Sequence, residues 1–130
     1  MKWLSAALTV VLSGCGAATG TLSQAQAACQ RGASHVEVTF NGTVGRILGV
    51  RRGPSGTHEG FLIRPDGAAT SELHVEDNID ITGFIPLHRS ERIELQGQYE
   101  CNDGVIHWTH RDTRGRHPAG YIKANGITYQ

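Results

Sequence analysis

Apolar and polar residues alternate with a period of two along several short segments of this 130-residue chain. In HVEVTF, residues 35–40, Val36, Val38 and Phe40 share one parity, and ERIELQGQYEC, residues 91–101, repeats the pattern. Such alternation places the apolar side chains on one face of a β-strand. The chain is therefore predicted to be an all-β protein.

Turn residues divide the pattern into five strands and a final hairpin. Asp66-Gly67 and Asn102-Asp103-Gly104 indicate tight turns, Gly45 indicates a bulge in a long first strand, and RRGPSGTHEG, residues 51–60, indicates a loop. Five short strands in one domain favour a small OB-type barrel over residues 33–130, with a C-terminal hairpin at Asn125-Gly126. A β-sandwich is the alternative, and no helix is expected after the N-terminal segment.

The N-terminus has the pattern of an export signal. Met1-Lys2 precedes the apolar run WLSAALTVVL, which is too short to span a bilayer as a helix, and LSGC, residues 12–15, matches a bacterial lipoprotein box. We therefore expect a signal peptide over residues 1–14, a lipidated Cys15 that anchors the protein in the cell envelope, and a flexible tether over residues 15–32. Ordinary cleavage after AQA, residues 25–27, is the rival prediction.

The cysteine count fits this assignment. Of three cysteines, lipidation of Cys15 leaves Cys29 and Cys101. An even remainder in an oxidising compartment indicates a disulfide bond, with two buried thiols as the alternative.

Charge is balanced over the chain, with 12 basic and 12 acidic side chains, so bulk charge does not predict tight non-specific binding of nucleic acid. The distribution is uneven. Residues 65–88 contain five acidic residues and no lysine or arginine, whereas residues 107–123 contain Arg111, Arg114, Arg116 and Lys123 against Asp112 alone. The fold is predicted to have a basic end.

That basic end contains the segment GVIHWTHRDTRGRH, residues 104–117. Planar guanidinium groups hold phosphate or carboxylate in bidentate fashion, and aromatic rings can stack on a nucleotide or a sugar. An anion-binding surface is one interpretation of this segment, and its candidate residues are Arg111, Arg114, Arg116, Trp108, Tyr99 and Tyr121.

Two other interpretations of the segment remain open. His107, His110 and His117 are candidate catalytic residues, and His110, Asp112 and His117 form a candidate site for a divalent metal, although no established zinc spacing is present. Alternatively the segment is a polar strand end, in which Trp108 covers the core and the arginines are solvated. Strand parity would place Trp108 with Ile106 and His110 on one face.

Two more histidines are weaker candidates. His58, in SGTHEG, is expected to be an exposed loop residue rather than a general base. His74 lies between Glu72 and Glu76, where a solvated acidic face is favoured over a metal or proton-transfer cluster.

The strings HWTH, GRH, GYIK and NGITYQ resemble a family of small exported bacterial proteins, domain of unknown function 3465, from about Gly42 to Gln130. The resemblance implies a compact envelope domain without an assigned activity. The family pattern has a second histidine followed by Asp-Pro after HWTH, where this chain has Arg111, Asp112 and Thr113. This difference disfavours a metal ligand at position 111 and favours an anion contact. GTVGRIL and GTHEGFLI also resemble OB-type strands of envelope and nuclease-like barrels, which is an analogy of fold.

The residues thus support three functional hypotheses. The first is an exported, lipid-anchored OB-like module that holds an oligonucleotide or an oligosaccharide at the His/Arg-rich surface. The second is a metal-assisted nuclease or phosphodiesterase that uses the same histidines. The third is a structural envelope lipoprotein without a small-molecule site.

Overall fold

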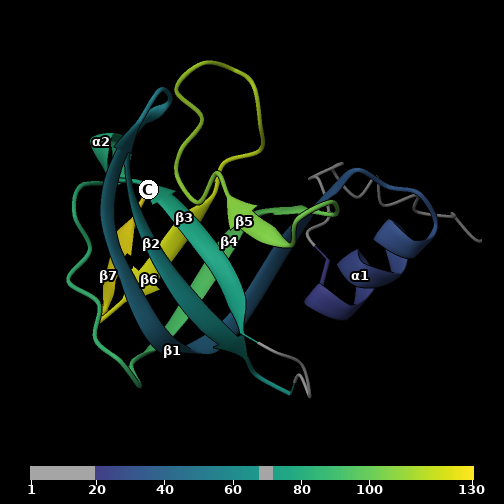
Figure 1. The fold of residues 1–130 in the computed structure, drawn as a ribbon, viewed down its shortest axis with the longest axis horizontal. Coiled ribbons are helices and arrows are strands. Elements are labelled where there is room, and N and C mark those ends of the chain that lie inside the picture. The colour runs from purple at the N-terminus through teal and green to yellow at the C-terminus, as the bar shows by residue number, and fades with distance from the viewer. Residues whose placement is uncertain (1–19, 68–71) are drawn as a thin grey trace, which may run out of the picture.

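The computed structural model describes residues 20–67 and 72–130, which form seven strands in one sheet and two short helices (Figure 1). The predicted signal peptide and Cys15 lie outside the described residues. The strands are β1 (His35–Gly53), β2 (Gly56–Pro65), β3 (Leu73–Asn78), β4 (Arg92–Glu100), β5 (Val105–His107), β6 (Tyr121–Ala124) and β7 (Ile127–Tyr129).

Five of these strands close into a ring. The sheet order is β1-β2-β3-β5-β4-β6-β7, and an additional antiparallel pairing joins β1 to β4. Within the ring, β3 and β5 are parallel, and the other neighbours are antiparallel. The all-β prediction is confirmed. Because all the described strands belong to a single sheet, they do not form the two-sheet sandwich.

The length of β1 makes the closure possible. Residues 35–43 pair with β4, whereas residues 42–53 pair with β2, so one strand contributes to two neighbouring edges. The register shifts between Val44 and Arg46, which confirms a bulge at Gly45, and it shifts again between Ile47 and Gly49. Bulges increase local twist and allow a strand to coil around a closed sheet.

The prediction of a loop over residues 51–60 is wrong. β1 and β2 continue through it, Gly53 pairs with Gly56, and only Pro54 and Ser55 form the turn. The segment is rich in turn-forming residues and polar because the hairpin extends away from the core, not because its backbone is irregular. His58 and Glu59 consequently lie on β2.

The prediction of a flexible tether over residues 15–32 is also wrong for the part that the structure describes, because residues 22–30 form a helix. Helix α1 (Leu22–Gln30) begins with a capping box in which the Thr21 side chain accepts from the Gln24 backbone and the Gln24 side chain accepts from Thr21. Leu22 is 6% exposed and Ala25 is fully buried. The reciprocal cap supplies two of the hydrogen bonds that the first turn of a helix lacks, so a small, polar segment can be helical.

A disulfide bond joins this helix to the sheet. Cys29 in α1 is bonded to Cys101, directly after β4, with 5.4 Å between the two Cα atoms. The predicted pairing is confirmed. A second unexpected helix, α2 (Ile79–Thr82), follows β3.

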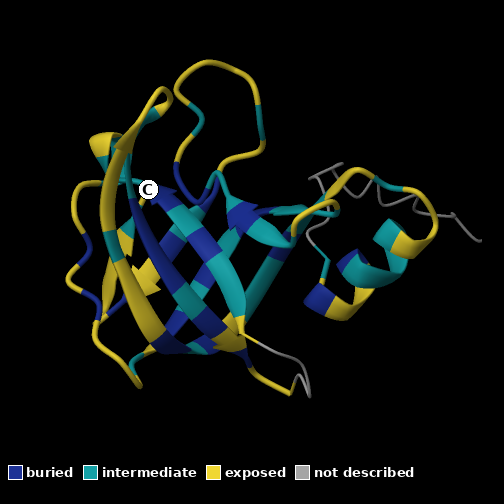
Figure 2. Ribbon diagram, viewed as in Figure 1, coloured by how far each residue is buried: buried dark blue, intermediate teal, exposed yellow. Residues whose placement is uncertain are grey.

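The core lies inside the ring (Figure 2), where most inward-facing side chains of the strands are apolar. Phe61, Ile63, Val75, Leu95 and Ile106 are completely buried. Outside the ring, β6 and β7 extend the sheet from β4 as the predicted hairpin, with Asn125 and Gly126 both at positive φ in its turn.

Candidate functional site

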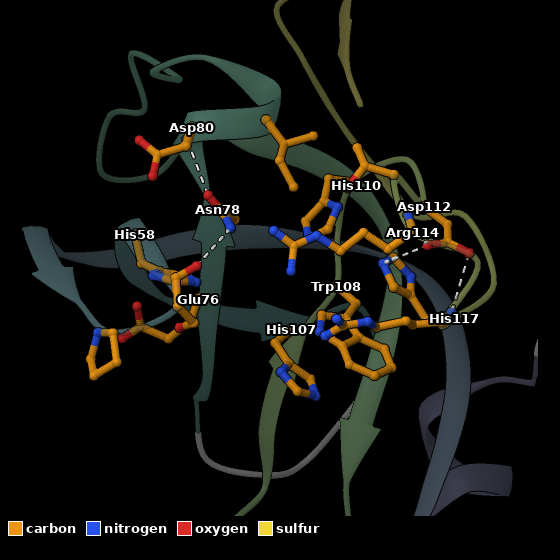
Figure 3. A pocket seen from close by; sticks show the side chains of 15 residues that line it. His58, Glu76, Asn78, Asp80, His107, Trp108, His110, Asp112, Arg114 and His117 are labelled. Atoms are coloured by element: carbon orange, nitrogen blue, oxygen red, sulfur yellow. Dashed lines mark hydrogen bonds and ion pairs between the residues drawn. The ribbon is translucent and has the colours of Figure 1, made fainter.

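A pocket of about 750 Å³ lies between the β1–β2 hairpin with α2 on one side and the histidine- and arginine-rich segment on the other (Figure 3). The first wall is lined by Pro54, Ser55, His58, Glu76, Asn78, Asp80 and Ile81, and the second by His107, Trp108, His110, Asp112, Thr113, Arg114, Arg116 and His117. Three parts of the chain, residues 54–58, 76–81 and 107–117, therefore form one site.

The second wall begins where β5 ends. Trp108 follows the last residue of β5 and has a positive φ of 54°. This conformation interrupts the strand parity, so Thr109 is the residue that enters the interior, fully buried, and Trp108 does not cover the core as the polar-strand-end interpretation required. The loop 108–120 then closes through a 2.8 Å hydrogen bond from the Gly120 amide to the His110 carbonyl.

Asp112 organises this loop. Its carboxylate accepts hydrogen bonds from the backbone amides of Arg114, at 3.0 Å, and His117, at 3.3 Å. Backbone donation, from Arg116 first and then from Arg114 and His117, holds the pKa of Asp112 below its usual value of 3.8. The residue predicted as a metal ligand therefore folds the loop.

Three rings form a stack along the pocket wall. The indole of Trp108 lies between the imidazoles of His107 and His117, at centroid distances of 4.9 and 4.4 Å (Figure 3). His107 forms one end of the stack, and its Nε2 contacts the carboxylate of Glu100 at 2.6 Å. Both neighbours of Trp108 in the stack are thus histidines, and a ligand would meet the outer ring or the edges of the stack rather than a free indole face.

Backbone carbonyls set which ring nitrogen of His110 and His117 carries the proton when the ring is neutral. His110 Nδ1 lies 2.7 Å from the Arg111 carbonyl oxygen, and His117 Nδ1 lies 2.7 Å from the Pro118 carbonyl oxygen. A carbonyl oxygen only accepts, so each Nδ1 carries the proton and each neutral ring keeps its Nε2 lone pair. The rings meet edge to face with centroids 5.0 Å apart.

The acidic side chains of the pocket have hydrogen-bond or ion-pair partners, and two of its arginines differ from them in this respect. Glu76 contacts both Arg51 and His74, and Asp80 accepts from the Thr57 amide, which lowers the pKa of Asp80. In contrast, within residues 20–67 and 72–130 no ion pair engages the guanidinium groups of Arg114 and Arg116. Figure 3 shows Arg114 reaching from the loop toward His110.

Two carboxyl groups that are not among the predicted site residues are buried next to the pocket. Glu59 is 1% exposed and Asp77 is fully buried, and they are paired across β2 and β3. Asp77 accepts hydrogen bonds from Thr109 in the loop and Thr82 in α2, and thereby links the two walls. Burial raises the pKa of both carboxyl groups, while the Thr109 and Thr82 hydroxyls oppose the shift at Asp77.

The signal for these residues was available in the sequence. Glu59 has the inward parity of Phe61 and Ile63, and Asp77 has that of Leu73 and Val75. An acidic residue on the apolar parity of a strand predicts a buried carboxyl group with specific partners.

A further carboxyl group, that of Glu37 on β1, interacts electrostatically with His117 and His107. Both of its oxygens are buried, and neither has a hydrogen-bond partner among residues 20–67 and 72–130. Burial raises the pKa of Glu37, and the nearby charges of His117, His35 and His107 oppose that shift.

Three predicted ligand contacts lie outside the pocket. Arg111 donates to the backbone oxygen of Gln130, and Tyr99 packs against the core. Tyr121 donates to Glu94, which raises the pKa of Tyr121 to about 12.

The histidines divide differently. His107, His110 and His117 all line the pocket, and so does His58, which is half-buried on β2 rather than exposed in a loop. His74 pairs with Glu76 and lines an adjoining hollow that shares His58, Glu76 and His107 with the pocket. The predicted metal set is not assembled, because the described residues contain no group of three histidine, cysteine or acidic side chains placed to hold a metal ion.

Neither described helix has the length and apolar character needed to cross a membrane. No curated protein and no solved structure matches the chain. A family model does match, over residues 8–130, and it carries the description "Protein of unknown function (DUF3465)". The match covers nearly the whole chain and includes every residue of the pocket, so the protein belongs to this family.

Proposed function

We propose that this protein is an exported, lipid-anchored, OB-like module that binds an anionic ligand, an oligonucleotide or an oligosaccharide, in the pocket of the loop 108–120. One observation carries the proposal. Arg114 and Arg116 line the pocket without acidic partners in the described structure, while Glu76, Asp80 and Asp112 are engaged by other groups. Unpaired guanidinium groups beside satisfied carboxylates attract an anion from solution.

The size and lining of the pocket support a small segment of a longer ligand. A volume of about 750 Å³ falls within the range of small-molecule sites, about 300–1,000 Å³. The ring stack of His107, Trp108 and His117 supplies a flat, polarisable wall beside the arginines. Phosphate recognition by arginine combined with stacking is the usual way in which proteins hold single-stranded nucleic acid, so an oligonucleotide is the favoured ligand.

Binding measurements test this proposal directly. The mature protein would be titrated against fluorescent single-stranded RNA, single-stranded DNA and an acidic oligosaccharide of matched charge. The double variant Arg114→Gln/Arg116→Gln is expected to lose at least tenfold in affinity, because each arginine contact to phosphate contributes about 1 kcal/mol or more.

The matched control is Arg46→Gln/Arg89→Gln, which removes two exposed arginines that do not line the pocket. Equal losses in the two double variants would reduce binding to bulk charge. No binding by the wild type to any of the three probes would overturn the proposal and favour a structural role in the envelope.

The lipid anchor is a separate part of the proposal and rests on LSGC directly after the apolar run. Labelling of expressing bacteria with a palmitate analogue should mark the wild type and fail to mark Cys15→Ser. A soluble, unlabelled wild type would contradict the anchor without affecting the pocket.

A further inference from the structure

His110 and His117 lie next to each other in the pocket, as the two members of an acid–base pair must. His110 is 6% exposed, the His117 side chain is 5% exposed, and both line the pocket. Their Nδ1 protons are committed to backbone carbonyls, so only Nε2 can exchange a proton with a ligand. The rings meet edge to face with centroids 5.0 Å apart, so the two Nε2 atoms belong to neighbouring side chains of one pocket.

The surroundings of the two rings differ. The carboxylate of Asp112 lies 3.9 Å from His117 Nε2 and stabilises a positive charge on that ring. No carboxylate in the described part of the chain lies within ion-pair distance of His110. His117 is therefore suited to donate a proton, and His110 is suited to accept one.

We infer that the pocket cleaves single-stranded RNA without a metal ion, with His110 as general base and His117 as general acid. This inference rests on the proposed function, because the arginines must first hold the phosphodiester. His110 Nε2 removes the proton of a ribose 2′-hydroxyl, and the 2′-oxygen forms a bond to phosphorus. The bond from phosphorus to the 5′-oxygen breaks, and that oxygen takes the Nε2 proton of His117. The products are a 2′,3′-cyclic phosphate and a 5′-hydroxyl, and no further reactant is consumed.

The residues of the wall favour this reaction over one that needs an activated water. RNA carries its own nucleophile, so the site needs only a base, an acid and a positive charge on the phosphate. Arg114 extends toward His110, where it can neutralise the charge that develops on the non-bridging oxygens (Figure 3). DNA lacks the 2′-hydroxyl and is expected to bind without being cleaved.

The experiment uses one DNA oligonucleotide that contains a single ribonucleotide, with the all-DNA oligonucleotide and a version carrying a 2′-O-methyl group at the same position. Mature wild-type protein is incubated with each probe in the presence of a chelator. Cleavage is expected only at the ribonucleotide, and mass spectrometry should show the cyclic phosphate on the 5′ fragment.

Variants tie the activity to the pocket. His110→Gln and His117→Gln should each lower the cleavage rate at least a hundredfold while affinity for the all-DNA probe changes less than threefold. The control is His88→Gln, an exposed histidine outside the pocket, which should cleave like the wild type. Because all proteins are purified identically, a contaminating nuclease would also cleave in the His110→Gln and His117→Gln preparations. Circular dichroism and thermal melting show whether each variant is folded.

The possible results separate the two proposals. Binding of all probes without cleavage of the ribonucleotide would overturn the catalytic inference and leave the binding function intact. Cleavage that needs a metal ion, that attacks the all-DNA probe, or that survives in both folded glutamine variants would also overturn it. Absence of binding would remove the proposed function itself.

Discussion

Trp108 is the residue at which the ring of strands becomes the wall of the pocket. Its φ of 54° lies in the left-handed region, which bulky residues rarely adopt and which costs of the order of 1–3 kcal/mol. The surrounding contacts stabilise it, because Thr109 bonds to Asp77 and two imidazoles stack on the indole. The turn at Trp108 keeps the His107 side chain outside the ring of strands and brings His117 into the same aromatic stack.

Removal of the indole tests this arrangement. Trp108→Ala should lower the free energy of unfolding by about 1–3 kcal/mol, the sum of two aromatic pairs worth roughly 0.5–1.5 kcal/mol each. Trp108→Phe should recover more than half of that loss. Denaturant unfolding followed by far-ultraviolet circular dichroism measures both variants. A loss above about 4 kcal/mol would mean that the indole behaves as a core side chain.

At this scale the sequence predicted well which residues would contribute to the site, but it predicted poorly which way their side chains face. Histidines 107, 110 and 117 and arginines 114 and 116 were identified because their chemistry is readable one residue at a time. The positive φ at Trp108 was not readable, since a tryptophan in a β-rich segment ordinarily continues the strand. That one dihedral angle exchanged the places of Trp108 and Thr109.

The loop 108–120 depends on how closely it approaches β4. A Cβ atom at Gly120 would lie 2.2 Å from the Trp108 carbonyl oxygen and 2.6 Å from that of Gln96, and backbone cannot give way at such distances. Gly120→Ala should therefore displace the loop, lower stability by about 2–4 kcal/mol and weaken binding in the pocket.

The matched control is Gly115→Ala in the same loop, where φ is +66° and a Cβ atom would have nothing within 4 Å. This variant should cost only about 1 kcal/mol for the conformation. Thermal unfolding and oligonucleotide titration distinguish the two. If Gly120→Ala binds and melts like Gly115→Ala, the close approach does not shape the pocket.

Helix α1 is attached to the sheet by one covalent bond and a small buried contact. Replacing Cys29 and Cys101 with serine opens a connection between residues separated by 72 positions, and the loop-entropy relation gives a loss of about 4–5 kcal/mol. Denaturant unfolding of this double variant and of the oxidised wild type measures the difference. A loss below about 1 kcal/mol would show that the bond adds little beyond the contacts of Leu22 and Ala25.

The elements that the sequence did not predict are those held by local hydrogen bonds. Both ends of the capping box were present as Thr21 and Gln24, but the small, polar composition around them indicated a tether. The β1–β2 hairpin was missed because RRGPSGTHEG contains turn residues at several positions, whereas the paired backbone uses only two of them. Strands with an apolar face were predicted because burial repeats along them.

For the whole molecule, the buried carboxyl groups make stability depend on pH. Burial raises the pKa of Glu37, Glu59 and Asp77 in the folded state above the usual values of 4.5, 4.5 and 3.8. Between the two values the folded chain binds protons that the unfolded chain does not, so the free energy of unfolding gains from these groups as the pH falls through that window.

A variant isolates this contribution. Glu59→Gln/Asp77→Asn should lose the gain, so the stability of the wild type relative to this variant should increase as the pH falls toward the usual carboxyl values of 4.5 and 3.8. Denaturant unfolding at several pH values gives both curves, and the histidines common to both proteins cancel in the difference. Parallel curves would mean that Glu59 and Asp77 do not take up protons on folding.

The closed ring follows from the parity of five strands, but the pocket does not. It requires the β1–β2 hairpin and α2 to face the loop 108–120, and these segments are joined through Asp77 by side-chain hydrogen bonds that leave no periodic signal. Only Glu59 and Asp77, acidic residues on an apolar parity, marked the place where the two walls meet.

The salt dependence of binding tests the anion site most directly. Affinity for a short single-stranded RNA would be measured between about 50 and 200 mM salt for the wild type, Arg114→Gln/Arg116→Gln and Arg46→Gln/Arg89→Gln, with the RNA 2′-O-methylated so that it stays intact. Each phosphate contact to a single strand contributes about 0.7 to the slope of log K against log salt, so the pocket variant should have a slope lower by about 1.4. The control should keep the slope of the wild type. A wild-type slope retained in the pocket variant would contradict the assignment of Arg114 and Arg116 as the anion site.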